Sequence, residues 1–172
     1  MDWFLQKFPQ RAVFAAKNPG YVIRSLYREL TSADERFLYT ITNVSTRRLR
    51  DFYDEPIHTQ HFSDCLRSAK DTFQALKIES ADLYAKKVLL QYAAVRAARP
   101  RIVVETGVAN GVSSAYLLLA LEANSSGTLY SIGLDDKEFL PEGKSLGWVV
   151  PKELRSRWKL LVGDSREMLP KL

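Results

Sequence analysis

Carboxylates recur directly after three short apolar runs of this sequence. They are Glu105, Asp135, Asp136 and Asp164. If the runs are parallel strands, their carboxyl ends meet at one edge of a sheet, which is where open α/β sheets bind ligands. Carboxylates at that edge accept hydrogen bonds from amino and hydroxyl groups and balance a positive charge. The spacing therefore predicts a site for a cationic or zwitterionic ligand.

The first of these acids, Glu105, opens a turn that contains two glycines. Gly107 and Gly111 lack the Cβ atom that would keep a ligand away from the backbone. The amides at the start of the following helix, near Ser113, carry partial positive charge that suits a carboxylate or phosphate. A dinucleotide site needs G-x-G-x-x-G, whereas this turn reads G-x-x-x-G and opens with an acid that would repel a pyrophosphate. A nicotinamide-dependent oxidoreductase is therefore the weaker interpretation.

Strand and helix patterns alternate around these acids, and the alternation must position them. Strands are predicted over residues 102–105, 128–134 and 160–162, and helices over residues 112–123, 152–157 and from Arg166, the last with Ser165 as its N-cap. The β-branched run that forms the first strand has the composition of a strand buried on both faces. Such alternation indicates βαβ units with right-handed crossovers. We expect an α/β fold, a Rossmann-like parallel sheet that is incomplete because only three strands are present.

The first part of the chain lacks this alternation. Residues 1–78 predict a helical N-terminal extension, with a break at Pro56, and residues 79–172 predict the sheet domain. A helix from about Ser80 to Arg99 should lead into the first strand. The aromatic side chains of the first thirty residues fit a buried core or a contact between copies of the chain. Any homo-oligomer is therefore expected to form through the N-terminal helices.

Composition narrows the classes of function further. The chain has 172 residues, a net charge of +5 and one cysteine, Cys65, so it forms no intrachain disulfide and fits a reducing, cytoplasmic compartment. No apolar run approaches the ~20 residues that cross a bilayer. The three arginines between residues 47 and 50 are interpreted as a solvated basic face and not as a nucleic-acid site. His58 and His61 have no second cluster of ligands, so no metal site is predicted.

Three stretches, taken in order, resemble the cofactor-binding half of class I S-adenosylmethionine-dependent methyltransferases. They are VETGVANGVSS, LYSIGLDD and WKLLVGDSREMLPKL. The likeness spans about residues 81–172 and is closest to bacterial small-molecule and sugar O-methyltransferases with a GW-x-VP segment, here Gly147 to Pro151. The resemblance implies S-adenosylmethionine as the cofactor and O-methylation of a small-molecule acceptor.

The resemblance also implies roles for individual residues. Glu105, Gly107 and Gly111 would line the methionyl end of the cofactor, where Ser113 would add a hydroxyl. Asp164, with the amide of Ser165, would face the adenine amino group.

Gly133 stands where the family carries the carboxylate that binds the two ribose hydroxyls. Asp135 lies two residues further on, so in an extended chain it points to the same face and is predicted to substitute. Asp136 is ranked below it, because it would point away unless the strand has ended.

Acceptor-side residues in the family follow a fourth strand, so no catalytic base is assigned here. We expect the 172 residues to be a fragment of a longer protein, or to be completed by another chain, and to be inactive alone. The alternative is a non-catalytic, degenerate methyltransferase fold that serves in assembly, which Gly133 and the short sheet both favour.

Overall fold

A computed structural model describes residues 32–75, 86–135 and 140–172. The chain divides into two compact units, Met1–Phe37 and Leu38–Leu172, and the second contains the sheet. The described helices are α4 (Ser32–Thr42), α5 (Thr46–His58), α6 (Gln60–Ala75), α7 (Lys86–Ala98), α8 (Val112–Ala123) and α9 (Ser165–Met168), with the 3-10 helices η1 (Lys152–Arg157) and η2 (Leu169–Lys171). The described strands are β1 (Ile102–Thr106), β2 (Thr128–Gly133) and β3 (Trp158–Val162).

The three strands form one parallel sheet in the order β1-β2-β3. The register pairs Glu105 with Ser131 and Ser131 with Leu160, so these three residues share one face of the sheet. An open three-stranded parallel sheet with flanking helices confirms the predicted α/β fold of incomplete Rossmann-like type.

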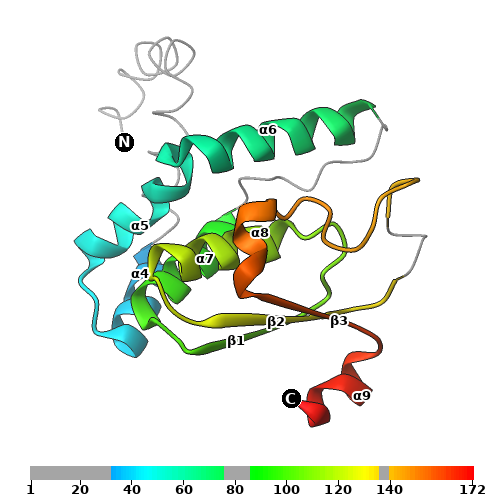
Figure 1. Cartoon of the computed structure of the whole chain (residues 1–172). Coiled ribbons are helices and arrows are strands. Elements are labelled where there is room, and N and C mark those ends of the chain that lie inside the picture. The colour runs from blue at the N-terminus through cyan, green and yellow to red at the C-terminus, as the bar shows by residue number, and fades with distance from the viewer. Residues whose placement is uncertain (1–31, 76–85, 136–139) are drawn as a thin grey trace, which may run out of the picture. The chain divides into compact units, whose positions relative to one another are not determined.

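Helices cover one face of this sheet. In Figure 1, α7 and α8 lie together above the strands, and α5 and α6 lie beyond them. Every residue of α8 from Ser114 to Leu121 is buried, because the helix has the sheet on one side and α7 and η1 on others. The connection from β1 to β2 contains α8, and the connection from β2 to β3 contains η1. Both run in the same direction across the sheet, so right-handed crossovers place α8 and η1 on the same face.

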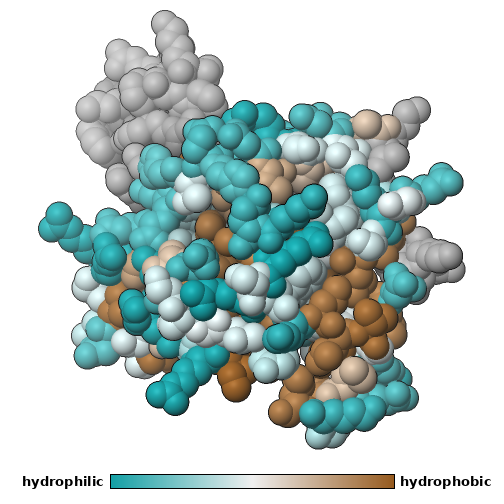
Figure 2. Space-filling model, in the orientation of Figure 1, coloured by the Kyte–Doolittle hydropathy of each residue, from teal (hydrophilic) through white to brown (hydrophobic). Residues whose placement is uncertain are grey.

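The opposite face is only partly covered, which corrects the prediction that the first strand is buried on both faces. Ile102 and Val104 of β1 are 61% and 46% exposed. At the other end of the sheet, α9 contacts β2, and Ile132 is only 1% exposed. Figure 2 shows apolar surface at the lower right of the molecule, next to the end of the chain that carries α9. Leu134, which directly follows β2, is 61% exposed. A β-branched run indicates a strand but does not reveal what covers it.

The helices before the sheet differ from the sequence prediction at Pro56. This residue lies inside α5 and is buried, and the chain leaves the helix only at Thr59. A proline costs a helix one backbone hydrogen bond, and near the end of a helix its buried ring can offset that loss. The predicted helix start at Ser80 lies outside the described residues, while the helix end near Arg99 and the bounds of α8 agree with prediction. No described helix is long and apolar enough to cross a membrane.

Candidate functional site

The turn between β1 and α8 holds both predicted glycines in left-handed conformations. The φ angles are 82° at Gly107 and 87° at Gly111. A Cβ at Gly107 would meet no atom within 4 Å, so this glycine does leave its backbone open to a ligand. A Cβ at Gly111 would instead lie 2.6 Å from Cα of Gly147. The two glycines therefore differ: one faces open space, and the other makes room for a distant segment of the chain.

Glu105 is the centre of a hydrogen-bond network that joins β1, α8 and β2. Ser113 donates to its Oε1, and Ser114 and Ser131 donate to its Oε2 at 2.6 and 2.8 Å. The indole Nε1 of Trp158, on β3, donates to Ser131 Oγ at 2.9 Å. Hydroxyl donors on both oxygens fix the orientation of the carboxylate.

A cavity of about 510 Å³ lies beside this network, at the carboxyl end of β1. Three of the predicted cofactor residues line it, namely Glu105, Gly107 and Ser113. Its other walls are apolar residues of β1 and α8, together with Lys87 and Gln91 of α7. The structure thus brings one cationic and one anionic side chain to a single cavity of a size that suits a small molecule.

Residues 144–150, called the strap below, lie directly on the turn after β1. The backbone amides of Gly147 and Val149 donate to the carbonyl oxygens of Ala109 and Asn110 at 2.9 and 3.0 Å. Trp148 Nε1 donates to the Asn110 side chain at 2.7 Å. These bonds join the strap to the turn, although the two segments are far apart in sequence.

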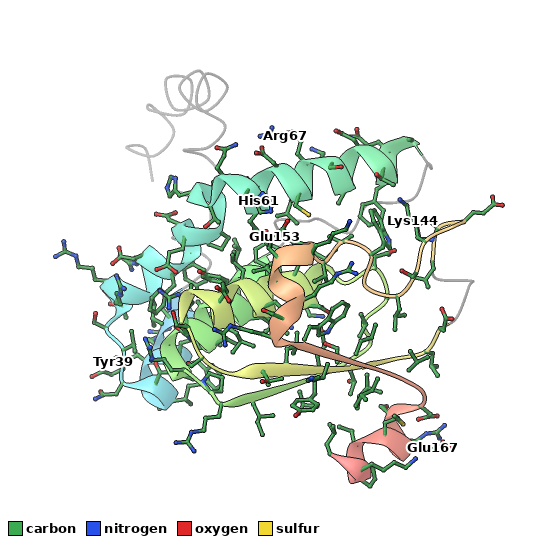
Figure 3. All side chains as sticks on the ribbon, in the orientation of Figure 1. Tyr39, His61, Arg67, Lys144, Glu153 and Glu167 are labelled. Atoms are coloured by element: carbon green, nitrogen blue, oxygen red, sulfur yellow. The ribbon has the colours of Figure 1, made fainter. Side chains whose placement is uncertain are left out.

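The strap is also held from the side of α6. The rings of Phe73 and Trp148 lie 5.2 Å apart, and Cys65 Sγ donates to the carbonyl of Val149 at 3.5 Å. Lys144 extends from the strap in Figure 3, with its Nζ 4.8 Å from the Trp148 ring centroid. In the same view His61 of α6 lies beside Glu153 of η1, 3.0 Å away. Trp148 therefore packs between α6 and the turn.

Gly133 is the last residue of β2 and is buried under apolar side chains. A Cβ there would lie 2.9 Å from Leu146 Cδ2, in the strap, and 3.2 Å from Val108 Cβ, in the turn. Asp135 is exposed two residues beyond the strand, and Asp136 lies outside the described residues. The space that a side chain at Gly133 would need is thus filled by Leu146 and Val108, while Asp135 stands at the surface two residues further on.

Asp164 begins α9 as its N-cap, a role the sequence analysis gave to Ser165. The Arg166 amide donates to Asp164 Oδ1 at 2.8 Å, and Ser165 is the first residue of the helix. The Arg166 guanidinium also donates to the same carboxylate, at 2.7 Å for Nη2. The side-chain and backbone hydrogen bonds from Arg166 lower the pKa of Asp164 to about 2. Neither Asp164 nor Ser165 lines the cavity beside β1.

The stretch that carries the turn, the strap and α9 is similar to a known family. Residues 104–172 match the family model described as Methyltransferase domain. The match supports a methyltransferase domain of the class I type, and it includes every predicted cofactor residue from Glu105 to Ser165. No curated protein and no solved structure matches the chain.

The methyltransferase match begins after α7, so it does not include the helix that supplies Lys87 and Gln91. Sequence reasoning missed both residues, and it also missed Ser131 and Trp158. The signal for the first pair was the spacing of four, which places two side chains on one helix face. No local pattern could have identified Trp158, because its partner Ser131 is 27 residues away.

A second cavity, of about 490 Å³, lies between α5, α7 and α8 and contains an internally paired network. Arg96 donates to both oxygens of Glu55 at 2.7 and 3.1 Å, and Tyr92 donates to Oε2 at 2.7 Å. Burial opposes ionisation, but hydrogen bonds from Arg96 and Tyr92 outweigh it and hold the pKa of Glu55 below its usual value. Burial also raises the pKa of Tyr92. Mutual pairing gives these groups a structural role without a ligand.

Proposed function

We propose that this chain binds S-adenosylmethionine at the carboxyl ends of its strands and supplies the cofactor-binding part of a methyltransferase. The cavity beside β1 carries the proposal, because it combines the Glu105 carboxylate with the open backbone of Gly107. The methyltransferase match to residues 104–172 supports it. We infer further that the acceptor is the oxygen of a small molecule, in line with the family that the motifs resemble.

The residues present fit this cofactor at its amino-acid end. Gly107 has free space on the side where a Cβ would stand, so a ligand can approach the turn closely. The fixed carboxylate of Glu105 favours a positively charged ligand. Gly111 supports the strap, and Asp135, Asp164 and Ser165 remain proposed contacts for the ribose and adenine.

Bound S-adenosylmethionine would supply an electrophilic methyl group on a sulfonium centre. The chain's own contribution is to bind and orient that group through Glu105, Gly107 and Ser113, and orientation accounts for much of the rate gain in such displacements. The described residues do not identify a base for the acceptor proton, so none is assigned.

Isothermal titration calorimetry tests the proposal directly. The chain should bind S-adenosylmethionine and its demethylated product S-adenosylhomocysteine, and should not bind NAD. Gly107→Ala should weaken this binding, whereas Gly143→Ala should leave it unchanged, since both glycines have positive φ and open space but only Gly107 lines the cavity. Binding of NAD without binding of either sulfur compound would overturn the proposal.

A non-catalytic module remains the second candidate, and one observation favours it. Leu146 and Val108 cover Gly133, where the family has its ribose-binding acid. A module of this kind would bind neither sulfur compound at millimolar concentration. The same titration therefore separates the two candidates.

A further inference from the structure

The cavity beside β1 has a second wall, formed by the first turns of α7. Lys87 and Gln91 stand four residues apart on this helix, so their side chains project from one face. Both line the cavity, opposite residues of β1 and α8. This wall lies before the segment that matches the methyltransferase family, and no motif assigns it a role.

Gln91, a residue of this wall, carries an acceptor that is not used within the fold. Its Oε1 is buried and has no hydrogen-bond donor within the described part of the chain. An amide oxygen that is removed from water and left without a donor destabilises the folded state, so such groups are rare. A ligand in the cavity that carries an N–H group would satisfy this oxygen once the Gln91 amide turns toward it.

Lys87 presents an unused cation at the same wall. Its side chain is exposed, and within residues 32–75, 86–135 and 140–172 its ammonium group has no ion-pair partner. The cavity lining therefore contains one ammonium, on Lys87, and one carboxylate, on Glu105, and its remaining residues are neutral. One charge of each sign complements a zwitterion better than it complements a phosphate or a simple cation.

We propose that Lys87 and Gln91 hold the amino-acid end of S-adenosylmethionine, an inference that rests on the proposed function. The α-carboxylate of the ligand accepts from the Lys87 ammonium, and its α-ammonium donates to Gln91 Oε1. Glu105 acts here chiefly through its charge, because three serine hydroxyls already donate to its oxygens. Helix α7 thus recognises the part of the ligand that distinguishes it from other adenosine thioethers.

Two related ligands test this assignment. S-adenosylhomocysteine contains the amino-acid end, and 5′-methylthioadenosine lacks it. Calorimetry on Lys87→Met should show about tenfold weaker binding of S-adenosylhomocysteine, as expected for a lost charge-assisted hydrogen bond, and unchanged binding of methylthioadenosine. Lys70→Met is the matched control, because Lys70 is exposed on α6, outside the cavity, and it should change neither affinity.

The outcomes separate this inference from the proposed function. If the unmodified chain binds neither compound, the proposed function itself fails. If it binds S-adenosylhomocysteine and Lys87→Met binds it equally well, the function stands and the role of Lys87 is refuted. Equal weakening toward both compounds would also refute it, since Lys87 would then act on the adenosine or on the fold.

Gln91→Leu adds a readout that a purely structural role would not produce. Removing an unsatisfied buried acceptor should raise the Tm of the ligand-free chain by about 2–4 °C, while S-adenosylhomocysteine binding weakens. Opposite changes in stability and affinity support a ligand-binding role. A lower Tm with unchanged affinity would show that Gln91 serves the fold alone.

Discussion

Gly147 packs so closely against Gly111 that a Cβ on Gly111 would lie only 2.6 Å from the Cα of Gly147. The contact is reinforced by the hydrogen bond from the Gly147 amide to the Ala109 carbonyl, 2.9 Å long. The conformation of the turn and the position of the strap are therefore determined together.

Replacing Gly111 with alanine should lower the free energy of unfolding more than the same change at Gly143, a left-handed glycine with open space around it. Alanine at a left-handed position costs about 1–2 kcal/mol, and the clash with Gly147 adds about 1–3 kcal/mol. Gly143→Ala is the control, because its φ is 71° and a Cβ there meets nothing within 4 Å. Urea unfolding measures both, and equal losses would contradict the proposed packing of strap on turn.

Replacing Ser131 with alanine should destabilise the chain through Glu105. The change removes a donor from the Glu105 carboxylate and the acceptor of Trp158 Nε1 at a fully buried position. The expected loss is about 1–3 kcal/mol in urea unfolding. Ser68→Ala, on the exposed side of α6, should change stability by less than about 0.5 kcal/mol. Similar effects at the two serines would mean that the Glu105 network contributes no stability.

Glu55 should make stability depend on pH in the acidic range. Its pKa is below the usual value of 4.5, so its ion pair contributes stability above that pH and loses it as the pH falls through the lowered pKa. Near neutral pH, Glu55→Gln should cost about 1–3 kcal/mol, because Arg96 stays partly buried without its counter-charge. The difference from the unmodified chain should shrink as the pH falls through the lowered pKa of Glu55.

The control for Glu55 is Asp51→Asn, which breaks the exposed pair with Arg48. Exposed pairs of this kind contribute about 0–1 kcal/mol, so the control should show little loss at any pH. A Glu55→Gln cost that stays constant from neutral to acidic pH would argue against the ion pair as its source.

Gly133→Asp, which introduces the acid expected at this position from the resemblance to methyltransferases, should fail to create a ribose site. The new carboxylate would be buried against Leu146 and Val108, at a cost of about 3 kcal/mol or more. Thermal unfolding and titration with S-adenosylhomocysteine measure the two effects. The double variant with Leu146→Ala should recover part of the stability, since it removes the nearer of the crowding side chains. Tighter binding in the single variant at unchanged Tm would contradict this expectation.

Local patterns predicted the elements well, because each depends on neighbouring residues. The apolar run Val112–Ala123 specified α8 to the residue, and the β-branched run specified β1. The role of Gly111 was not predictable in this way, since its need for glycine arises from Gly147, which is distant in sequence. The same holds for Gly133, whose surroundings come from the strap and the turn, and for the role of α7 at the cavity.

The two described tryptophans each donate an indole hydrogen bond, Trp148 to Asn110 in the turn and Trp158 to Ser131 on β2. Indole emission responds to the polarity and hydrogen bonding around the ring. The fold thus has one natural fluorescent probe in the strap, Trp148, and one beside the Glu105 network, Trp158. With Trp3 replaced by phenylalanine, the remaining fluorescence would report on these two places. Changes at the strap and changes at the Glu105 network become separately observable by quenching in single-tryptophan variants, with no added label.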